Sequence, residues 1–338
     1  MTTLENRSAG IDLLRCISIA LVIIDHYGLA PGFWPWGGTH GVVIFFMVSG
    51  YCMAFSTSGR SGGQFLSARF WRLVPTLLVC ATITAAVEAA FPEVRPDRVQ
   101  GLRSFVGTTV CLPFGRIACD IPHLFWRGTP FEFDWVDGAY WSLLVEIRFY
   151  LLLWALLYVL KAGRPALILA TLGLFAVLNL EPQWISKGSD FLLYLPFFAF
   201  GMAYRDWTTG RRGRLTAAWS VAAYLFVASV GAKAISMSLS PANLLSYFSC
   251  FAVFVFFMRF YRQGHSRFVS YLGLLTYPLY LIHQDVGLVL FGLIGDGVVG
   301  TLAVLAIVLA IAATVNHVTE RTVPAMRRSL SPRVRAAS

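Results

Sequence analysis

Long apolar stretches, separated by short segments that carry Gly, Pro and Arg, make up most of this chain. A helix rises about 1.5 Å per residue, so about twenty apolar residues cross the roughly 30 Å of hydrocarbon in a bilayer. On this basis we predict about ten membrane-spanning helices. Their approximate ranges are 10–29, 40–57, 73–91, 139–160, 165–180, 190–204, 215–235, 243–261, 271–292 and 298–318. The stretches 165–180 and 190–204 are short, and we expect them to be either tilted or partly re-entrant.

The composition excludes a disordered chain and a water-soluble one. Of the 338 residues, 57% are apolar and 13% are charged, and the mean hydropathy is +0.67. A soluble domain carries about a quarter of charged residues, so this chain has too little polar surface to face water on all sides. Helices satisfy their own backbone hydrogen bonds in lipid. The predicted fold class is therefore all-α, a polytopic integral membrane protein.

The net charge of +10 indicates membrane topology rather than nucleic-acid binding. If the N-terminus is cytoplasmic and the chain changes sides at every span, most of the 27 Lys and Arg residues fall on inner segments. The short outer segments then hold only Lys187 and Lys233. Such an excess is typical of cytoplasmic loops, so we predict that both termini are cytoplasmic. A secretory signal at the N-terminus is disfavoured, because the first apolar run carries Asp12, Arg15 and Asp25.

The segment 92–138 is the only sizeable extramembrane part that we predict, and a loop of that length usually has a function. Its Cys111 and Cys119 would face an oxidising compartment, where a disulfide can form, although we favour free thiols. The six cysteines of the chain show no CxxC spacing, so no metal site is predicted.

Ionisable residues inside predicted spans are candidates for function, because a charge in the bilayer is costly unless it is paired or faces water. Arg15 and His26 are 11 residues apart, which places both on one face of the first helix. Their offset along the helix axis is about 16 Å, with Arg15 near the cytoplasmic surface and His26 in the outer half. The structural alternative is an Arg that reaches to the headgroups and a His that caps the helix end.

Glu146, in the fourth predicted span, reaches about the same depth as His26. A buried carboxylate at that level can orient an imidazole and stabilise its charged form. The alternative is a structural clamp between helices. Arg148 points from another face of the same helix, and we expect it either to pair with another acid or to meet an anionic ligand.

Two further spans carry candidate residues. His283 also reaches the outer half, after Tyr277 and Pro278, which we expect to kink the ninth span. Its alternative role is that of a packed, hydrogen-bonded residue. In the second span, Ser49 and Gly50 form a small pair that lets a neighbouring backbone or a thin ligand come close.

Arg69 and Arg72 are predicted on the first inner loop, where their i, i+3 spacing places both on one face of a helical turn. Anchoring to anionic lipid is one explanation. A phosphate clamp is the other, because guanidinium groups bind phosphate oxygens bidentately.

Taken in order, these segments resemble the membrane acyltransferase 3 family, whose members acylate hydroxyl groups on sugars and related envelope molecules. The resemblance covers roughly residues 10–324 and rests on Arg15 with His26, 41–51, 69–75, 141–150 with Glu146, 272–283, and more weakly Glu320 with Pro324. The chain departs from the family pattern at two places. Ala68 stands where another Arg is frequent, and Ile147 and Arg148 stand where a second acid often follows Glu146.

The resemblance implies an acyl-CoA donor, with acetyl-CoA as the default, and a carbohydrate or lipid-linked sugar acceptor. It implies His26 and Glu146 as catalytic residues. The expected donor-binding residues are Arg15, Arg69, Arg72, Ser49, Gly50 and Arg148, and the expected acceptor-binding residues are Trp141, Ser142, Tyr277 and His283. We expect a membrane domain over 1–324, a basic cytoplasmic tail over 325–338 and a location in the bacterial inner (plasma) membrane.

Two other classes of function fit a charged membrane core. A transporter or flippase of an anionic envelope lipid or sugar would use the same charges as a permeation path. A receptor or scaffold would use them only to hold helices together. For the enzyme, direct attack assisted by His26 as general base and an acyl-His intermediate both fit the residues.

Overall fold

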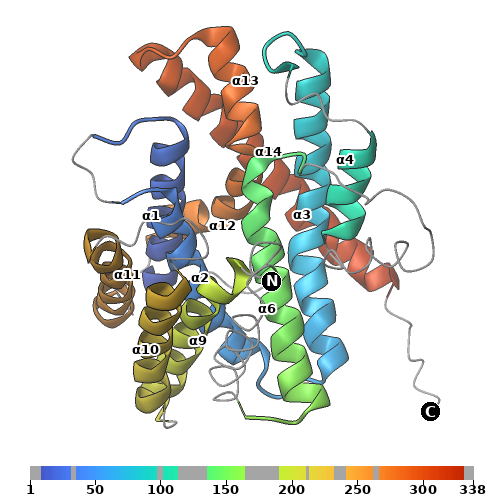
Figure 1. Cartoon of the computed structure of the whole chain (residues 1–338). Helices are drawn as coiled ribbons and strands as arrows, with labels where there is room; N and C mark the ends of the chain where they lie inside the picture. The colour runs from blue at the N-terminus through green and yellow to red at the C-terminus, as the bar shows by residue number, and fades with distance from the viewer. Residues whose placement is uncertain are drawn as a thin grey trace, which may run out of the picture. The chain divides into compact units, whose positions relative to one another are not determined.

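The computed structural model describes residues 9–31, 36–96, 102–112, 135–163, 190–210, 213–231, 241–261 and 266–330. Every regular element among these residues is a helix (Figure 1). The chain divides into two compact units, each of which is described by itself. Unit 1 consists of Met1–Leu66 and Ser142–Thr276, and unit 2 consists of Ser67–Trp141 and Tyr277–Ser338.

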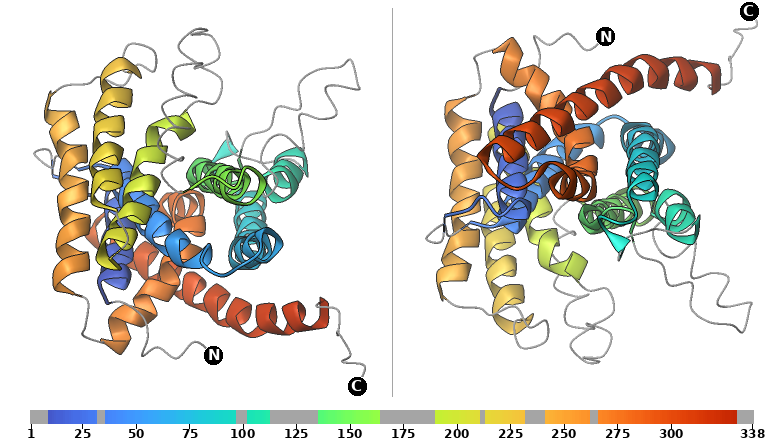
Figure 2. Two further views of the ribbon diagram at one scale, coloured as in Figure 1. Left: turned by 90° about the horizontal axis from the view of Figure 1, so that it is seen from below. Right: turned by 90° about the horizontal axis from the view of Figure 1, so that it is seen from above.

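Unit 1 is organised around a central helix, α2. Its elements are α1 (Ala9–His26), α2 (Gly38–Ser56), most of α6 (Trp141–Trp154), the π-helical segment η5 (Ala155–Val159), α9 (Asp190–Thr208), α10 (Arg214–Gly231), α11 (Pro241–Phe260) and the first part of α12 (Arg267–Ile282). Helix α2 packs against α1, α9 and α11, and α10 lies against α9 (Figure 2). Because α2 has neighbours on several sides, most of its residues are buried, as expected for a helix that is apolar all round.

Glycines set the distances between the helices of unit 1. A Cβ atom at Gly41 would overlap the backbone of α1 at Ser18, and a Cβ atom at Gly50 would overlap the backbone of α9 at Phe198. From the other side, a Cβ atom at Gly201 in α9 would overlap the backbone of α2 at Met47. Small residues at such crossings let the two backbones approach closely. The resulting van der Waals contacts stabilise the packing of helices in lipid.

Unit 2 contains the rest of the described helices. They are α3 (Gly62–Ala90) from Ser67 onward, α4 (Leu102–Val106), the π-helical segment η3 (Gly107–Cys111), the 3₁₀ turn η4 (Gly138–Tyr140), the end of α12, α13 (Asp285–Ile294) and α14 (Val298–Leu330). Helix α13 packs against α14, which is the long red helix in Figure 2. Short connections join α12, α13 and α14, so consecutive helices remain close together.

The prediction of an all-helical membrane protein is confirmed. A helix covers most of each predicted span except 165–180, which lies outside the described residues. Within the described part of the chain, four helical stretches are long and apolar enough to cross a membrane: Gly38–Ser56, Gly62–Ala90, Gly138–Val159 and Val298–Arg327. The pair α12 and α13 forms a fifth if it is counted as one bent span. A total of ten spans and cytoplasmic termini remain predictions.

Two details of the predicted helices were wrong. Arg69 and Arg72 do not lie on a loop, because α3 begins at Gly62 and contains both residues. The ninth span is not one continuous helix, because it bends by 77° between α12 and α13, after Ile282. Helix α12 runs through Pro278, and a kink there remains a prediction. A proline removes one backbone donor without ending a helix whose side chains are packed, whereas Asp285 begins a new helix. Helix α14 also continues through Pro324, so the start of the predicted tail is helical.

Replacement of Gly50 by Ala is expected to destabilise the protein, because the added methyl group would overlap the α9 backbone at Phe198. Overpacking of this kind costs about 1–3 kcal/mol, which would lower the Tm of the purified protein in detergent. The matched control is Gly63→Ala, whose methyl group would meet no atom within 4 Å. An unchanged Tm for Gly50→Ala would contradict the close contact between α2 and α9.

Candidate functional site

A carboxylate held by two hydroxyl groups lies between α2 and α6 in unit 1. The Ser49 hydroxyl donates a hydrogen bond of 2.7 Å to Oε1 of Glu146, and the Tyr150 hydroxyl donates to the same oxygen. The Ser49 and Tyr150 oxygens are also 3.1 Å apart. Tyr150 is buried, whereas Glu146 is partly exposed. Two donors on one oxygen therefore fix the position of a carboxylate that keeps some access to its surroundings.

Neighbouring residues of α2 make contact with different helices. Ser49 contacts α6 through Glu146, and Gly50 faces the α9 backbone at Phe198. The Tyr51 hydroxyl accepts a hydrogen bond of 3.5 Å from Arg205 of α9. A small residue at position 50 was predicted to admit either a neighbouring backbone or a thin ligand. The structure shows a neighbouring backbone, that of α9. Donor binding at Gly50 remains a prediction.

Arg15 is paired with an acid on its own helix. One of its guanidinium nitrogens lies 3.4 Å from Oδ1 of Asp12, and another lies 3.9 Å from the Cys52 sulfur in α2. The exposed fractions of the two charged side chains are 11% for Arg15 and 1% for Asp12. Gly273 of α12 packs against Asp12, because a Cβ atom there would lie 2.7 Å from Oδ1. The charge of Arg15 is therefore partly balanced inside unit 1, a partner that the sequence analysis did not assign.

The other predicted site residues of unit 1 lie on two helices, α1 and α6. His26 is the last residue of α1 and is half-buried. Ser142 is buried near the start of α6, and Arg148 is half-buried two residues after Glu146. The structure thus brings Ser49 together with Glu146 directly.

Asp25, the neighbour of His26, lies against Gly38 at the start of α2, whereas Glu146 contacts Ser49, about 16 Å further along the same helix. The prediction that Glu146 reaches the depth of His26 is therefore wrong, because Glu146 lies nearer the level of Arg15, which contacts Cys52.

The remaining predicted site residues, Arg69, Arg72, Trp141, Tyr277 and His283, belong to unit 2. The Tyr277 hydroxyl donates a 2.9 Å hydrogen bond to the backbone carbonyl of Leu73 in α3, so this side chain joins α12 to α3. His283 is fully buried, and its Nδ1 lies 2.8 Å from the backbone carbonyl of Tyr280. A carbonyl oxygen only accepts, so Nδ1 must carry the proton, and Nε2 is the basic nitrogen of the neutral ring.

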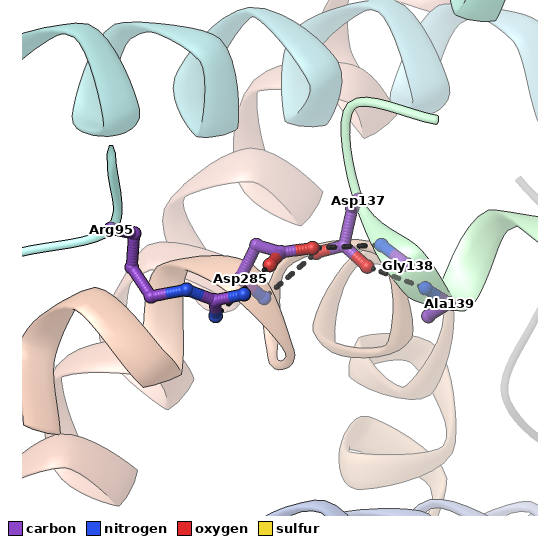
Figure 3. A network of polar contacts seen from close by, with 5 residues as sticks. All are labelled: Arg95, Asp137, Gly138, Ala139 and Asp285. Atoms are coloured by element: carbon purple, nitrogen blue, oxygen red, sulfur yellow. Dashed lines mark hydrogen bonds and ion pairs between the residues drawn. The ribbon is translucent and has the colours of Figure 1, made fainter. Parts of the chain in front are cut away.

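The sequence analysis missed a buried pair of aspartates in unit 2. Asp137 precedes η4, Asp285 begins α13, and each carboxylate accepts a hydrogen bond from the other segment's backbone (Figure 3). Oδ2 of Asp285 accepts from the Gly138 amide at 2.7 Å, and Oδ2 of Asp137 accepts from the Asp285 amide at 3.2 Å. Oδ1 of Asp137 also accepts from the Ala139 amide at 2.8 Å. We call Asp137, Asp285 and these amides the aspartate clasp.

The clasp has a clear electrostatic basis. Amide groups at a helix N-terminus have no partner within the helix and carry a partial positive charge, which a carboxylate satisfies. Arg95 supplies a further positive charge, with a guanidinium nitrogen 3.4 Å from Oδ1 of Asp285. Both aspartates are buried, and burial together with the charge of Asp285 raises the pKa of Asp137. An Asp at a predicted helix start is a recognisable signal in the sequence, but nothing in the sequence indicates that the two N-termini face each other.

A buried histidine in unit 1 was also missed. Nδ1 of His40 accepts a 3.0 Å hydrogen bond from the Gly37 amide, and Nε2 lies 2.9 Å from the Ser246 hydroxyl of α11. The ring stacks on Tyr247, with centroids 4.2 Å apart. Because Nδ1 accepts, Nε2 carries the proton of the neutral ring and donates to Ser246. This imidazole therefore cannot take a proton from Ser246, and the pair joins α2 to α11 rather than forming a nucleophile with its base.

Among the described residues, no group of three or more His, Cys, Asp and Glu side chains could hold a metal ion. Four cysteines whose side chains are described, Cys16, Cys52, Cys80 and Cys250, are free thiols. The predicted choice between a disulfide and free thiols at Cys111 and Cys119 falls outside the described side chains.

Comparison with known proteins assigns the family. The family described as "Acyltransferase domain", acyltransferase family 3, matches residues 8–317, which is most of the 338-residue chain. The chain therefore belongs to this family, as its motifs predicted. It is also similar to the protein named "Putative membrane-bound transacylase BcsY" of Komagataeibacter xylinus. The two are 26% identical over 294 residues, which cover 82% of this chain and 72% of the relative. No solved structure gave a significant match.

The family and the apolar helices together establish the class of protein. The chain is a multi-pass membrane acyltransferase, an enzyme that transfers an acyl group from a donor to an acceptor. Neither the identity of the donor nor that of the acceptor follows from family membership alone.

Replacement of Asp137 by Asn is expected to change how stability depends on pH. A raised pKa means that the folded protein holds this proton more tightly than the unfolded chain, so ionisation destabilises the fold as the pH rises above the ordinary value of 3.8. Asn cannot ionise and keeps one acceptor oxygen. The Tm of Asp137→Asn minus the Tm of the wild type should therefore increase as the pH rises from about 4 to about 8.

The matched control is Asp296→Asn, on an exposed turn of the same unit, which should follow the wild type at every pH. A constant difference between Asp137→Asn and the wild type over this range would show that Asp137 ionises at the same pH in the folded and unfolded states. That result would contradict the electrostatic account of the clasp, in which Asp285, Glu88 and Arg95 are the charged neighbours.

Proposed function

We propose that the protein transfers an acyl group, with acetyl as the default, from acyl-CoA to a hydroxyl group of an envelope carbohydrate. The donor enters from the cytoplasmic side of the bacterial inner membrane. This proposal rests on the family and on the residues of unit 1 that carry the family motifs. The relative from Komagataeibacter xylinus supports it in outline, because a transacylase also moves an acyl group between two carriers.

The observation that carries the proposal is the fixed carboxylate of Glu146. A carboxylate among apolar helices is costly, and hydrogen bonds from Ser49 and Tyr150 offset only part of that cost. Such a group is typical of a site where positive charge develops during a reaction. In our proposal that charge is the imidazolium of His26, which forms when the imidazole takes the proton of the acceptor hydroxyl and which Glu146 balances through the apolar core rather than by direct contact.

The chemical step uses groups of this chain only for proton transfer and orientation. The acceptor oxygen attacks the thioester carbon, a C–O bond forms and the C–S bond breaks. His26 takes the hydroxyl proton and returns it to the departing sulfur, so that free CoA leaves. An acyl-His26 intermediate gives the same products by two transfers, and both routes use the same residues.

The binding roles follow from charge and position. Arg69 and Arg72 lie on α3 at i, i+3 spacing, which suits the phosphates of a donor. Arg15 lies on the same helix as His26, about 16 Å away along the axis, a distance of the order of an extended pantetheine arm. We assign Trp141, Ser142, Tyr277 and His283 to the acceptor, because they lie in two of the segments that carry the family motifs.

Replacement of His26 by Ala is expected to abolish acyl transfer while the protein still folds and inserts, because the base that takes the hydroxyl proton is missing. Envelope glycans from cells that carry the wild-type gene, the variant or no gene should be compared by mass spectrometry. The wild type alone should add the acyl mass, which also identifies the acyl group and the acceptor.

The matched control is His317→Ala, which removes an exposed histidine of α14 and should leave the acyl mass unchanged. Full acylation in the His26 variant would exclude the proposed mechanism. Movement of an envelope lipid or sugar across the membrane with no added mass, in wild-type cells, would instead favour the transporter or flippase.

A further inference from the structure

Arg205, in the last turn of α9, lies over two aromatic rings of α2, those of Tyr51 and Phe55. Its guanidinium carbon is 3.8 Å from the centre of the Phe55 ring and 5.6 Å from that of the Tyr51 ring. A guanidinium nitrogen donates a 3.5 Å hydrogen bond to the Tyr51 hydroxyl. Arg205 is half-buried, whereas 51% of Phe55 is exposed. The guanidinium group is thus held over the Phe55 ring, and it has N–H donors beyond the one that bonds Tyr51.

The close crossing of α2 and α9 places Arg205 beside these two rings. Gly50 of α2 and Gly201 of α9 bring the two backbones into contact, as described above. Arg205 follows Gly201 by one helical turn on the same face of α9, and Tyr51 and Phe55 follow Gly50 on α2. Tyr51 and Phe55 are themselves one turn apart, with ring centres at 5.8 Å. A rigid contact between two helices therefore fixes the position of the guanidinium group.

The charge of Arg205 differs from that of Arg15 in how it is balanced. Arg15 lies against the Asp12 carboxylate, whereas within the described residues the hydrogen-bond and ring contacts of the Arg205 guanidinium group are with the neutral Tyr51 and Phe55. A guanidinium has five N–H donors, and the contact with Tyr51 uses one of them at long range. Aromatic rings stabilise the cation by only about 0.5–2 kcal/mol, so a second, anionic partner is favoured at this position.

We propose that Arg205 binds a phosphate group of the acyl-CoA donor. This inference rests on the proposed function and extends it to a residue outside the family motifs discussed above. A guanidinium edge matches phosphate oxygens bidentately, and the stacked Phe55 ring keeps that edge oriented. Arg15 contacts Cys52, the neighbour of Tyr51, so two guanidinium groups from α1 and α9 reach α2 at one level.

A phosphate of an anionic lipid would offer Arg205 the same chemistry, so the experiment must separate the two sources. Purified wild-type protein and Arg205→Gln are placed in nanodiscs of phosphatidylcholine and titrated with CoA and with pantetheine, which lacks the phosphates. Arg205→Gln should weaken CoA binding roughly ten- to a hundredfold, the loss expected for a hydrogen bond to a charged group. Pantetheine binding should not change.

Arg259→Gln is the matched control, because Arg259 also lies over an aromatic ring, that of Phe260, at 5.9 Å on α11. It should bind CoA as the wild type does. Arg205→Lys keeps the charge but loses the flat fork, and it should fall between Arg205→Gln and the wild type. Equal Tm values for the variants and the wild type exclude misfolding as the cause.

Equal CoA affinity of Arg205→Gln and the wild type would overturn the inference and leave the proposed function standing. If the wild type then retained more added phosphatidylglycerol than Arg205→Gln did, Arg205 would be a lipid-headgroup site instead. Equal losses for CoA and pantetheine would also overturn the inference, because they would show an effect that does not depend on phosphate. A wild type that bound no CoA in the nanodiscs would overturn the proposed function itself.

Discussion

The constraint on which this structure depends is that polar groups among apolar helices need partners from the protein itself. Hydrocarbon offers no hydrogen bonds, so each carboxylate must find hydroxyl, amide or guanidinium donors nearby. Glu146 finds them in Ser49 and Tyr150, Asp12 in Arg15, and the aspartate clasp in two helix N-termini and Arg95. These contacts join neighbouring helices, and one of them holds Glu146, for which we propose a role in acyl transfer.

Helix α2 shows how packing and chemistry share a few residues. Gly41 and Gly50 let α1 and α9 approach closely. Ser49 contacts Glu146 of α6, and Tyr51 contacts Arg205 of α9. A larger residue at position 50 would therefore separate α9 from α2 and also displace the guanidinium from its aromatic neighbours. In a membrane enzyme of this kind, a substitution that looks purely structural is expected to change donor binding as well.

Sequence reasoning predicted the class of fold and the helix positions well, because apolar length is a strong signal in lipid. It placed Ser49 and Glu146 among the site residues, which the structure brings together. It did not find Asp12 as the partner of Arg15, although their i, i+3 spacing on one helix is a pattern that the sequence displays. It did not find His40 with Ser246, because that pair depends on which helix faces lie inward. The wrong loop at Arg69 arose from treating a polar stretch as a break, although α3 continues through it. Long-range pairing, as in the clasp, is decided by tertiary packing and leaves no local pattern.

The 77° bend between α12 and α13 limits how that part of the chain can sit in a bilayer. Two arms at nearly a right angle cannot both follow the membrane normal, so at least one of them must be strongly tilted. If α12 stands upright, its 16 residues rise about 24 Å, which is less than the hydrocarbon thickness. The buried imidazole at its end would then sit below the lipid surface, and the bilayer would have to thin or the protein admit water there, which is how an acceptor sugar could meet it.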